Sequence, residues 1–149
     1  MNTPSTAKII DFIKKHHVLT LATCSDNKPW CCNCFYAFYE TGNLLVFTSE
    51  ENTRHVAEAL TNHEVSGSIV LETRIVGRIQ GLQLTGHMFR PEGELLEKVR
   101  KRYLKRFPYA RFMLAELWCI ELKYLKYTDN TLGFGKKLIW DTSSGRNDL

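Results

Sequence analysis

Val18-Leu-Thr-Leu-Ala-Thr-Cys-Ser25 is rich in β-branched and apolar residues, and it runs into the turn residues Asp26-Asn27-Lys28-Pro29. This composition predicts a β-strand followed by a tight turn. Two more strands follow, from Trp30 to Tyr39 and over Leu44-Leu-Val-Phe-Thr-Ser49, with turn residues at 40–43 between them. The stretch therefore predicts three antiparallel strands joined by short hairpins, without helices between them.

A short helix over about residues 53–62 follows the third strand and opens on Asn52-Thr53-Arg54-His55. Free backbone N–H groups and the helix dipole favour an anion at such an N-terminus, and Arg54 adds a bidentate phosphate ligand. We therefore expect a phosphate-binding site here. Glu50 and Glu51 would repel an anion unless they point away. The competing interpretation of Arg54 is an ordinary solvent-exposed helix residue.

The rest of the chain alternates between helical and strand-like patterns. Helices are predicted over about residues 6–16 and 91–106, and strands over about residues 65–73, 79–89 and 115–127. Gly81 and Gly86 inside a strand pattern indicate a bulge or a close backbone approach. Short antiparallel strands with inserted helices predict a small, closed or partly split β-barrel with helical caps, an α+β fold that is mainly β.

Length and composition fit one soluble globular domain. The chain has 149 residues, of which 44% are hydrophobic and 24% are charged. No apolar run reaches membrane-spanning length and the N-terminus lacks a signal-peptide core, so we expect a cytoplasmic protein without a membrane partner. Six of the twenty basic residues fall in residues 98–106. They form the solvated side of an amphipathic helix, so we expect no nucleic-acid partner.

The chain has five cysteines, and Cys31, Cys32 and Cys34 are crowded into one predicted strand. Adjacent strand residues point to opposite faces, which makes Cys31 and Cys32 a poor disulfide pair. Zinc requires about four converging ligands, and no second cluster has suitable spacing. We therefore expect reduced thiols and no metal site.

Several of these segments together resemble the FMN-binding split-barrel proteins related to pyridoxamine 5′-phosphate oxidase, in particular the uncharacterised YhbP-like subgroup. The resemblance covers about residues 8–140. The matching segments are Leu19-Thr-Leu-Ala-Thr-x-x-x-Asn-x-Pro29, Leu45-Val-Phe-Thr-Ser49 with Thr53-Arg54-His55, residues 80–86, Trp118-x-Ile-x-Leu122, and Lys126-Tyr-Thr-Asp-Asn-x-x-Gly-Phe-Gly-Lys-Lys137.

The resemblance implies a six-stranded antiparallel split β-barrel that forms a homodimer, with FMN in a groove between the subunits. It also implies a flavin-dependent oxidoreductase with an unknown small-molecule substrate. The cofactor-binding residues that it implies are Thr48, Thr53 and Arg54 at the phosphate, Cys32, Asn33 and Cys34 beside the ring, Phe47, and Gln80 or Gln83 from the later strand.

This sequence departs from the oxidases at two places. Cysteines replace an Arg early in the second strand, and Arg54-His55 replaces an Arg-Lys pair after the third strand. The residues that bind the substrate phosphate near the C-terminus have no counterpart here, so we do not expect vitamin B6 oxidation. No side chain stands out as a catalytic acid or base.

Two alternative functions remain open. The first is a non-catalytic module that binds a flavin or another phosphorylated ligand. The second is a haem-binding split barrel, for which the five histidines supply candidate ligands.

The residues themselves also favour a homodimer. Four aromatic residues lie on strands whose polar alternation is incomplete, namely Phe35, Phe38, Tyr39 and Trp118. Such apolar residues on a small barrel favour a partner surface.

Overall fold

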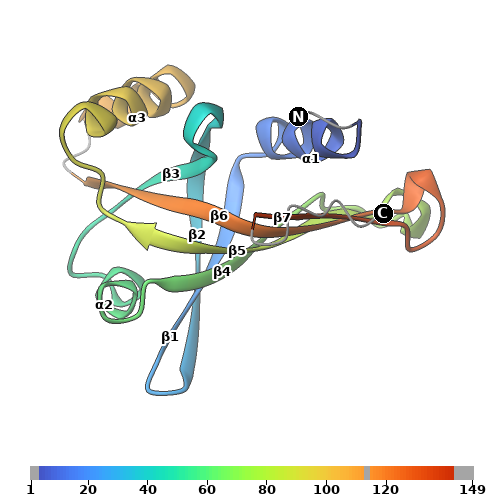
Figure 1. Cartoon of the computed structure of the whole chain (residues 1–149), viewed down its shortest axis with the longest axis horizontal. Coiled ribbons are helices and arrows are strands. Elements are labelled where there is room, and N and C mark those ends of the chain that lie inside the picture. Colours follow the sequence, from blue (N-terminus) through green and yellow to red (C-terminus); the bar gives the residue numbers. More distant parts are fainter. Residues whose placement is uncertain (1–3, 113–114, 143–149) are drawn as a thin grey trace.

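One seven-stranded antiparallel sheet forms the body of the protein, with the strand order β3-β2-β1-β4-β5-β6-β7. The structure is a computed structural model that describes residues 4–112 and 115–142. The strands are β1 (Val18–Ser25), β2 (Lys28–Tyr39), β3 (Leu44–Ser49), β4 (Glu64–Val70), β5 (Gln80–Phe89), β6 (Glu116–Asp129) and β7 (Lys137–Asp141). The helices are α1 (Pro4–Lys15), α2 (Arg54–Thr61) and α3 (Gly93–Arg106) (Figure 1).

The first six strands close into a barrel because β3 pairs with both β2 and β6. The first half of the long strand β6 pairs with β3, from Ser49↔Glu116 to Leu44↔Glu121. Its second half pairs instead with β7, from Tyr124↔Asp141 to Thr128↔Lys137. The six-stranded barrel expected from the sequence is therefore confirmed, and a seventh strand that the sequence did not predict extends it beyond the closed ring.

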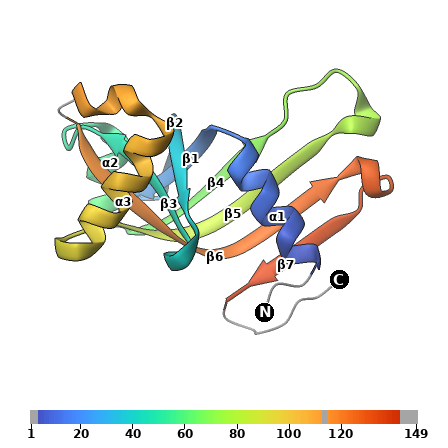
Figure 2. The ribbon, with the colours of Figure 1, turned by 90° about the horizontal axis from the view of Figure 1, so that it is seen from above.

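The β1–β2 hairpin has a two-residue turn, because Ser25 pairs directly with Lys28. Asp26 and Asn27 in this turn have φ of 51° and 58°. Asp and Asn adopt this left-handed conformation more readily than most residues, and two such residues suit the twist of a tight hairpin. In Figure 2 the β4–β5 and β6–β7 hairpins extend to one side as two arms, and α1 lies over this part of the sheet.

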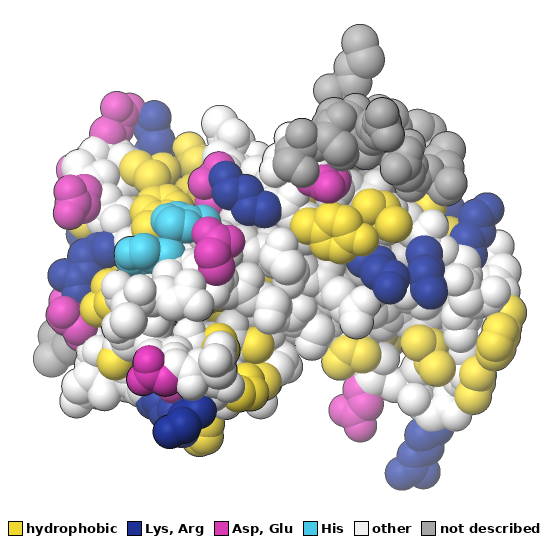
Figure 3. Space-filling view, turned by 60° about the horizontal axis from the view of Figure 1, so that its bottom comes forward, with side chains coloured by type: hydrophobic (Ala, Val, Ile, Leu, Met, Phe, Trp, Pro, Cys, Tyr) yellow, Lys and Arg dark blue, Asp and Glu magenta, His cyan; other side chains and the backbone are white. Residues whose placement is uncertain are grey.

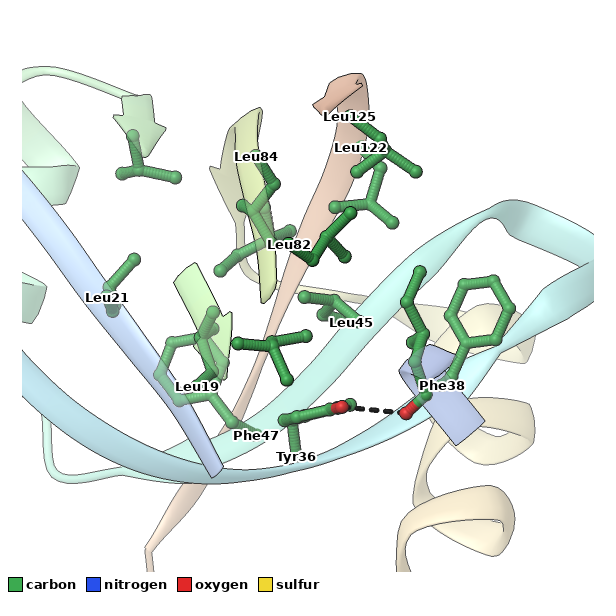
Figure 4. Packing of buried hydrophobic residues seen from close by; sticks show 14 of the residues in the cluster. Leu19, Leu21, Tyr36, Phe38, Leu45, Phe47, Leu82, Leu84, Leu122 and Leu125 are labelled. Atoms are coloured by element: carbon green, nitrogen blue, oxygen red, sulfur yellow. Dashed lines mark hydrogen bonds between the residues drawn. The ribbon is translucent and has the colours of Figure 1, made fainter. Parts of the chain in front are cut away.

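Alternate side chains of the strands fill the barrel (Figure 4). Leu19, Leu21, Phe47 and Leu82 are each 1% exposed or less. The helix α1 packs onto the same core, and the Phe12 ring lies 5.0 Å from that of Tyr127. The helix α2 adds the buried residues Val56 and Ala59.

A second cluster lies on the outer face of β2, β3 and β6, where α3 packs. Val99 and Tyr103 of this helix cover Ala37 and Val46. By contrast, the outward side chains of β1, β4 and β5 line an open groove, described below. Two residues expected on a partner surface point into the core instead, since Phe38 is 2% exposed and Trp118 is fully buried. Phe35 is 60% exposed and remains available to a partner.

Candidate functional site

The N-terminus of α2 lacks a side-chain cap, which leaves it suited to an anion. The hydroxyl of Thr53, the residue before the helix, donates to the carbonyl of Glu50 at 2.8 Å rather than accepting from the helix. The first turn contains no acidic residue. Since the first N–H groups of a helix have no partner inside the helix, an anion bound here would satisfy them.

Arg54 lies beside this N-terminus, and its side chain is 49% exposed. Its guanidinium stacks 4.2 Å from the ring centroid of Trp30, and its Nε donates to Glu58 at 2.8 Å. Glu58 also accepts from Thr23 at 2.7 Å. These hydrogen bonds, the one from Arg54 above all, lower the pKa of the Glu58 carboxyl. The Trp30 ring and the Glu58 carboxylate therefore both contact the guanidinium, and its charge is paired with Glu58.

The carboxylate of Glu51 forms an ion pair with Arg90, which it shares with Glu116. Arg90 binds it at 2.9 Å and binds Glu116 at 2.5 Å. The condition that this acidic residue should point toward another partner is therefore met.

Three metal-binding side chains converge next to the same helix. Cys32 and Cys34 lie on one face of β2, and their Sγ atoms are 3.8 Å apart. The ligand atoms of Cys32, Cys34 and His55 all lie within 4.8 Å of one another. Nε2 of His55 lies 2.7 Å from the hydroxyl of Ser49, the last residue of β3. The sequence offered only a faint signal for this cluster, because His55 lies 21 or more positions along the chain from the cysteines.

The two thiols have different acidities. A hydrogen bond from Cys34, followed by the neighbouring His55, lowers the pKa of Cys32 to about 5. The same thiol pair and the burial of the side chain raise the pKa of Cys34. These shifts favour the thiolate, which is the reactive form of a cysteine, at Cys32 rather than at Cys34.

The structure separates some of the residues that the sequence grouped at the phosphate. Thr48 points to the opposite side of β3, where its hydroxyl lies 3.2 Å from that of Tyr103 in α3. Ser49 takes the place expected for Thr48, since its hydroxyl lies 3.2 Å from that of Thr53. Phe47 is fully buried in the barrel core. Thr53 and Arg54 follow one another at the start of α2, where the Thr53 hydroxyl contacts Ser49 and the Arg54 guanidinium contacts Trp30 and Glu58.

An outer groove of about 380 Å³ lies over β1, β4 and β5. Small or uncharged side chains line it, among them Thr20, Ala22, Ser66, Ser68 and Gln83. Asn33 extends this polar surface, because it accepts a hydrogen bond from Thr20 at 2.9 Å.

Gln80 and Gln83 lie on opposite faces of β5. Gln80 shares the face of the buried Leu82, whereas Gln83 is exposed on the groove side. Cys32 and Cys34 likewise face the core, while Asn33 between them is exposed. Of the residues expected beside a flavin ring, Asn33 and Gln83 are therefore the ones on the outer surface.

Another cavity, with a volume of about 590 Å³, lies elsewhere, between α3 and the start of β6. Thr48, Tyr103 and Arg100 line it, together with Arg90, whose charge is already paired with two carboxylates. This cavity does not include Thr53 or Arg54.

Two histidines lie side by side on the face shown in Figure 3. The rings of His63 and His87 have centroids 5.1 Å apart. Nδ1 of His63 lies 3.0 Å from the carbonyl oxygen of Met88, and Nδ1 of His87 lies 3.2 Å from Glu64. Each ring thus has one nitrogen in contact with a protein oxygen.

The fold defines a class of proteins. The chain superposes on a haem-binding protein from Mycobacterium smegmatis with a TM-score of 0.80 at 18% identity, over 95% of this chain and 59% of that one. Campylobacter jejuni ChuZ superposes with a TM-score of 0.75 at 17% identity, over 99% of this chain and 64% of that one. A FAD-binding protein from Mesorhizobium loti superposes with a TM-score of 0.66 at 12% identity, over 80% of this chain and 90% of that one. The protein therefore has a split-barrel fold. It spans less than two thirds of the length of the Mycobacterium smegmatis and Campylobacter jejuni proteins.

A UPF0306 protein of Yersinia pestis is 39% identical over 141 residues, which cover 94% of this chain and 96% of that protein. The UPF0306 protein of Yersinia pseudotuberculosis shows the same identity and coverage. The chain therefore belongs to the UPF0306 family. No family model matches the sequence. None of the helices within residues 4–112 and 115–142 has the length and apolar character needed to cross a membrane.

Proposed function

We propose that this protein binds FMN and acts as a flavin-dependent oxidoreductase on a small molecule. The observation that carries the proposal is the uncapped N-terminus of α2 with the guanidinium of Arg54 held beside it by Trp30 and Glu58. This arrangement suits a terminal phosphate, because it combines backbone donors, the helix dipole and a charge-assisted ligand. The names of similar structures, one FAD-binding and one haem-binding, support a cofactor role.

Thr53 and Arg54 would hold the phosphate, and the exposed ring of Trp30 would shield one side of it. Asn33 and Gln83, which face away from Trp30, would meet the edge of the flavin ring held by a second copy of the chain, since amides offer both a donor and an acceptor. They belong to the outer face of the barrel, where small side chains leave room for a planar group. FMN would supply the electron transfer, while these residues bind and orient it.

A second copy of the chain would complete this site. The groove over β1, β4 and β5 is shallow and uncharged, and the exposed Phe35 lies on the same face of β2 as Asn33. A surface of this kind suits a homodimer in which each subunit covers the groove of the other. All five cysteines are unpaired, which fits the reducing cytoplasm.

The test compares FMN with riboflavin, which lacks the phosphate. Arg54→Ala should weaken FMN binding roughly ten- to a hundredfold, because a hydrogen bond to a charged group contributes about 1.5–3 kcal/mol. Riboflavin binding should change little. Arg74→Ala serves as the matched control, since Arg74 is an exposed arginine between β4 and β5. Equal weakening of both flavins would remove Arg54 from the phosphate site.

The absorption spectrum of freshly purified protein distinguishes the alternatives. Flavin bands would support the proposal, whereas a Soret band would favour a haem-binding protein. If flavin binds but no electron acceptor or donor reacts with it, the non-catalytic binding module is the better description. A wild-type protein that binds neither FMN nor riboflavin would refute the proposal.

A further inference from the structure

Cys32, Cys34 and His55, which we name the thiol–imidazole cluster, are brought together by three separate features of the fold. The pleat of β2 places Cys32 and Cys34 on one face, because alternate strand residues point the same way. Pairing with β1 fixes their register, with Leu21 opposite Cys32 and Leu19 opposite Cys34. The turn from β3 into α2 then delivers His55 to the same place.

The spacing of the two sulfur atoms, which suits a thiol–thiol hydrogen bond, also matches that of a metal site. Tetrahedral zinc holds each thiolate sulfur at about 2.3 Å, which places two such sulfurs about 3.8 Å apart. The observed Sγ–Sγ distance is 3.8 Å. The imidazole of His55 completes a set of three ligand atoms that lie within 4.8 Å of one another.

A disulfide fits the same pair poorly. Two residues that are two positions apart in a strand have Cα atoms about 6.6–6.8 Å apart, at the upper end of the range that a disulfide spans. Closing the bond would need the sulfurs to approach to about 2.05 Å, which the paired backbone of β2 opposes. A bridging metal ion requires no such movement.

Contacts around the cluster match those of metal sites. The Ser49 hydroxyl lies 2.7 Å from Nε2 of His55, and the Thr53 hydroxyl lies 3.4 Å from the same nitrogen. With Nε2 engaged by these hydroxyls, Nδ1 would hold the metal, and the Ser49 contact would orient the ring as outer hydrogen-bonding partners do for metal-ligating histidines. Cys32 and His55 are partly exposed, which gives an ion a route in. Two soft sulfur ligands and an imidazole select zinc or a similar thiophilic ion over magnesium or calcium.

We propose that Cys32, Cys34 and His55 bind one thiophilic divalent metal ion of the zinc class, with the fourth position open to water or a small ligand. Three protein ligands and one open position are typical of reactive zinc sites rather than purely structural ones. This site adjoins the proposed phosphate ligand Thr53, whose hydroxyl lies 3.4 Å from Nε2 of His55, but its three ligands are other residues and it does not depend on flavin binding.

The experiment titrates metal-free, reduced, full-length protein with Co²⁺, a spectroscopic substitute for zinc. Wild-type protein should bind one Co²⁺ per chain, with intense near-ultraviolet thiolate-to-cobalt absorption that Zn²⁺ abolishes by displacement. Cys34→Ser should lose about half of that absorption, since one of two thiolate ligands is removed. Ser49→Ala should weaken binding roughly ten- to a hundredfold through the loss of the outer hydrogen bond.

Cys31→Ser is the matched control, because Cys31 lies on the same strand with its side chain on the opposite, exposed face. It should leave the cobalt spectrum unchanged. Circular dichroism checks that each variant is folded, and Cys34→Ala replaces Cys34→Ser if the latter is not. Wild-type protein without thiolate-to-cobalt absorption would overturn the proposal, and so would a Cys31→Ser spectrum altered as much as that of Cys34→Ser. Neither result bears on FMN binding, which is measured without metal.

Discussion

The hydroxyl of Tyr36 in β2 donates a 2.7 Å hydrogen bond to the backbone carbonyl of Ile13, near the end of α1 (Figure 4). The last carbonyls of a helix lack partners inside the helix, so this bond satisfies one of them from another element. Arg106 of α3 donates in the same way to the carbonyls of Lys14 and His16. The end of α1 is therefore fixed by side chains from two distant parts of the chain.

Tyr36→Phe should lower the free energy of unfolding by about 1–3 kcal/mol, because it leaves a buried carbonyl without a partner. Urea denaturation followed by circular dichroism measures the change. Tyr109→Phe is the control, since Tyr109 is 82% exposed. If both variants unfold at the same urea concentration as the wild type, the bond does not stabilise the fold.

Gly86→Ala should destabilise the barrel by about 1–3 kcal/mol through overpacking. A Cβ atom at Gly86 would lie 2.6 Å from the carbonyl oxygen of Glu121 and from Cγ2 of Ile120. The β5–β6 register also shifts between Thr85 and Gly86, so the expected close approach is confirmed at this glycine. Gly77→Ala, where a Cβ would meet nothing within 4 Å, should unfold like the wild type in the same urea experiment.

The positions of the first six strands along the chain could be predicted from the sequence because their patterns are local. β1 to β3 are rich in β-branched and apolar residues, and turn residues separate them. Strand β7 was not predicted. It pairs with the second half of β6, while the first half of β6 pairs with β3. Nothing in the nearby sequence shows that β6 divides its pairing in this way. Pairing between distant segments has no local signature.

The site was harder to predict because it depends on which face each residue occupies. A shift of one residue exchanges the faces of a strand, and the neighbours Thr48 and Ser49 show the consequence. Thr48 contacts α3 and Ser49 contacts His55. The spacing of three between Gln80 and Gln83 similarly puts them on opposite faces. The thiol–imidazole cluster needed the three-dimensional path from β3 into α2.

In metal-free protein, iodoacetamide should alkylate Cys32 before the other cysteines at about pH 6.5. This pH lies above the lowered pKa of Cys32 and below the ordinary thiol pKa of about 8.5. Its pKa of about 5 makes it a thiolate at that pH, and burial raises the pKa of Cys119 to about 12. Peptide mass spectrometry identifies the order of labelling. Faster labelling of the more exposed Cys31 would contradict the prediction, whereas slower labelling of Cys32 in His55→Ala would support it.

His16 should make the fold sensitive to acid. Its Nε2 is buried without a hydrogen-bond partner in the described residues, and burial, followed by the charges of Lys15, His17 and Arg106, lowers its pKa. The unfolded chain therefore binds the proton more tightly, and stability falls as pH drops from about 6.5 through the folded pKa.

His16→Phe should reduce the loss of stability between about pH 7.5 and about pH 5.5, measured by urea unfolding at both values. Phenylalanine keeps the aromatic contact with Phe12, whose ring lies 4.2 Å from that of His16. His17→Phe is the control at an exposed neighbour and should stay acid-sensitive. An unchanged pH dependence in His16→Phe would show that other groups control it.

Phe35→Glu should convert a dimer into a monomer at about micromolar concentration, as measured by light scattering, because it places a charge inside the proposed interface. Phe35 is 60% exposed, and the neighbouring groove over β1, β4 and β5 is lined by uncharged residues. Phe134→Glu is the matched control, since Phe134 is 85% exposed but lies beyond the barrel, between β6 and β7. It should remain dimeric. A monomeric wild type would remove the groove between subunits, and the flavin site would then have to be complete within one chain.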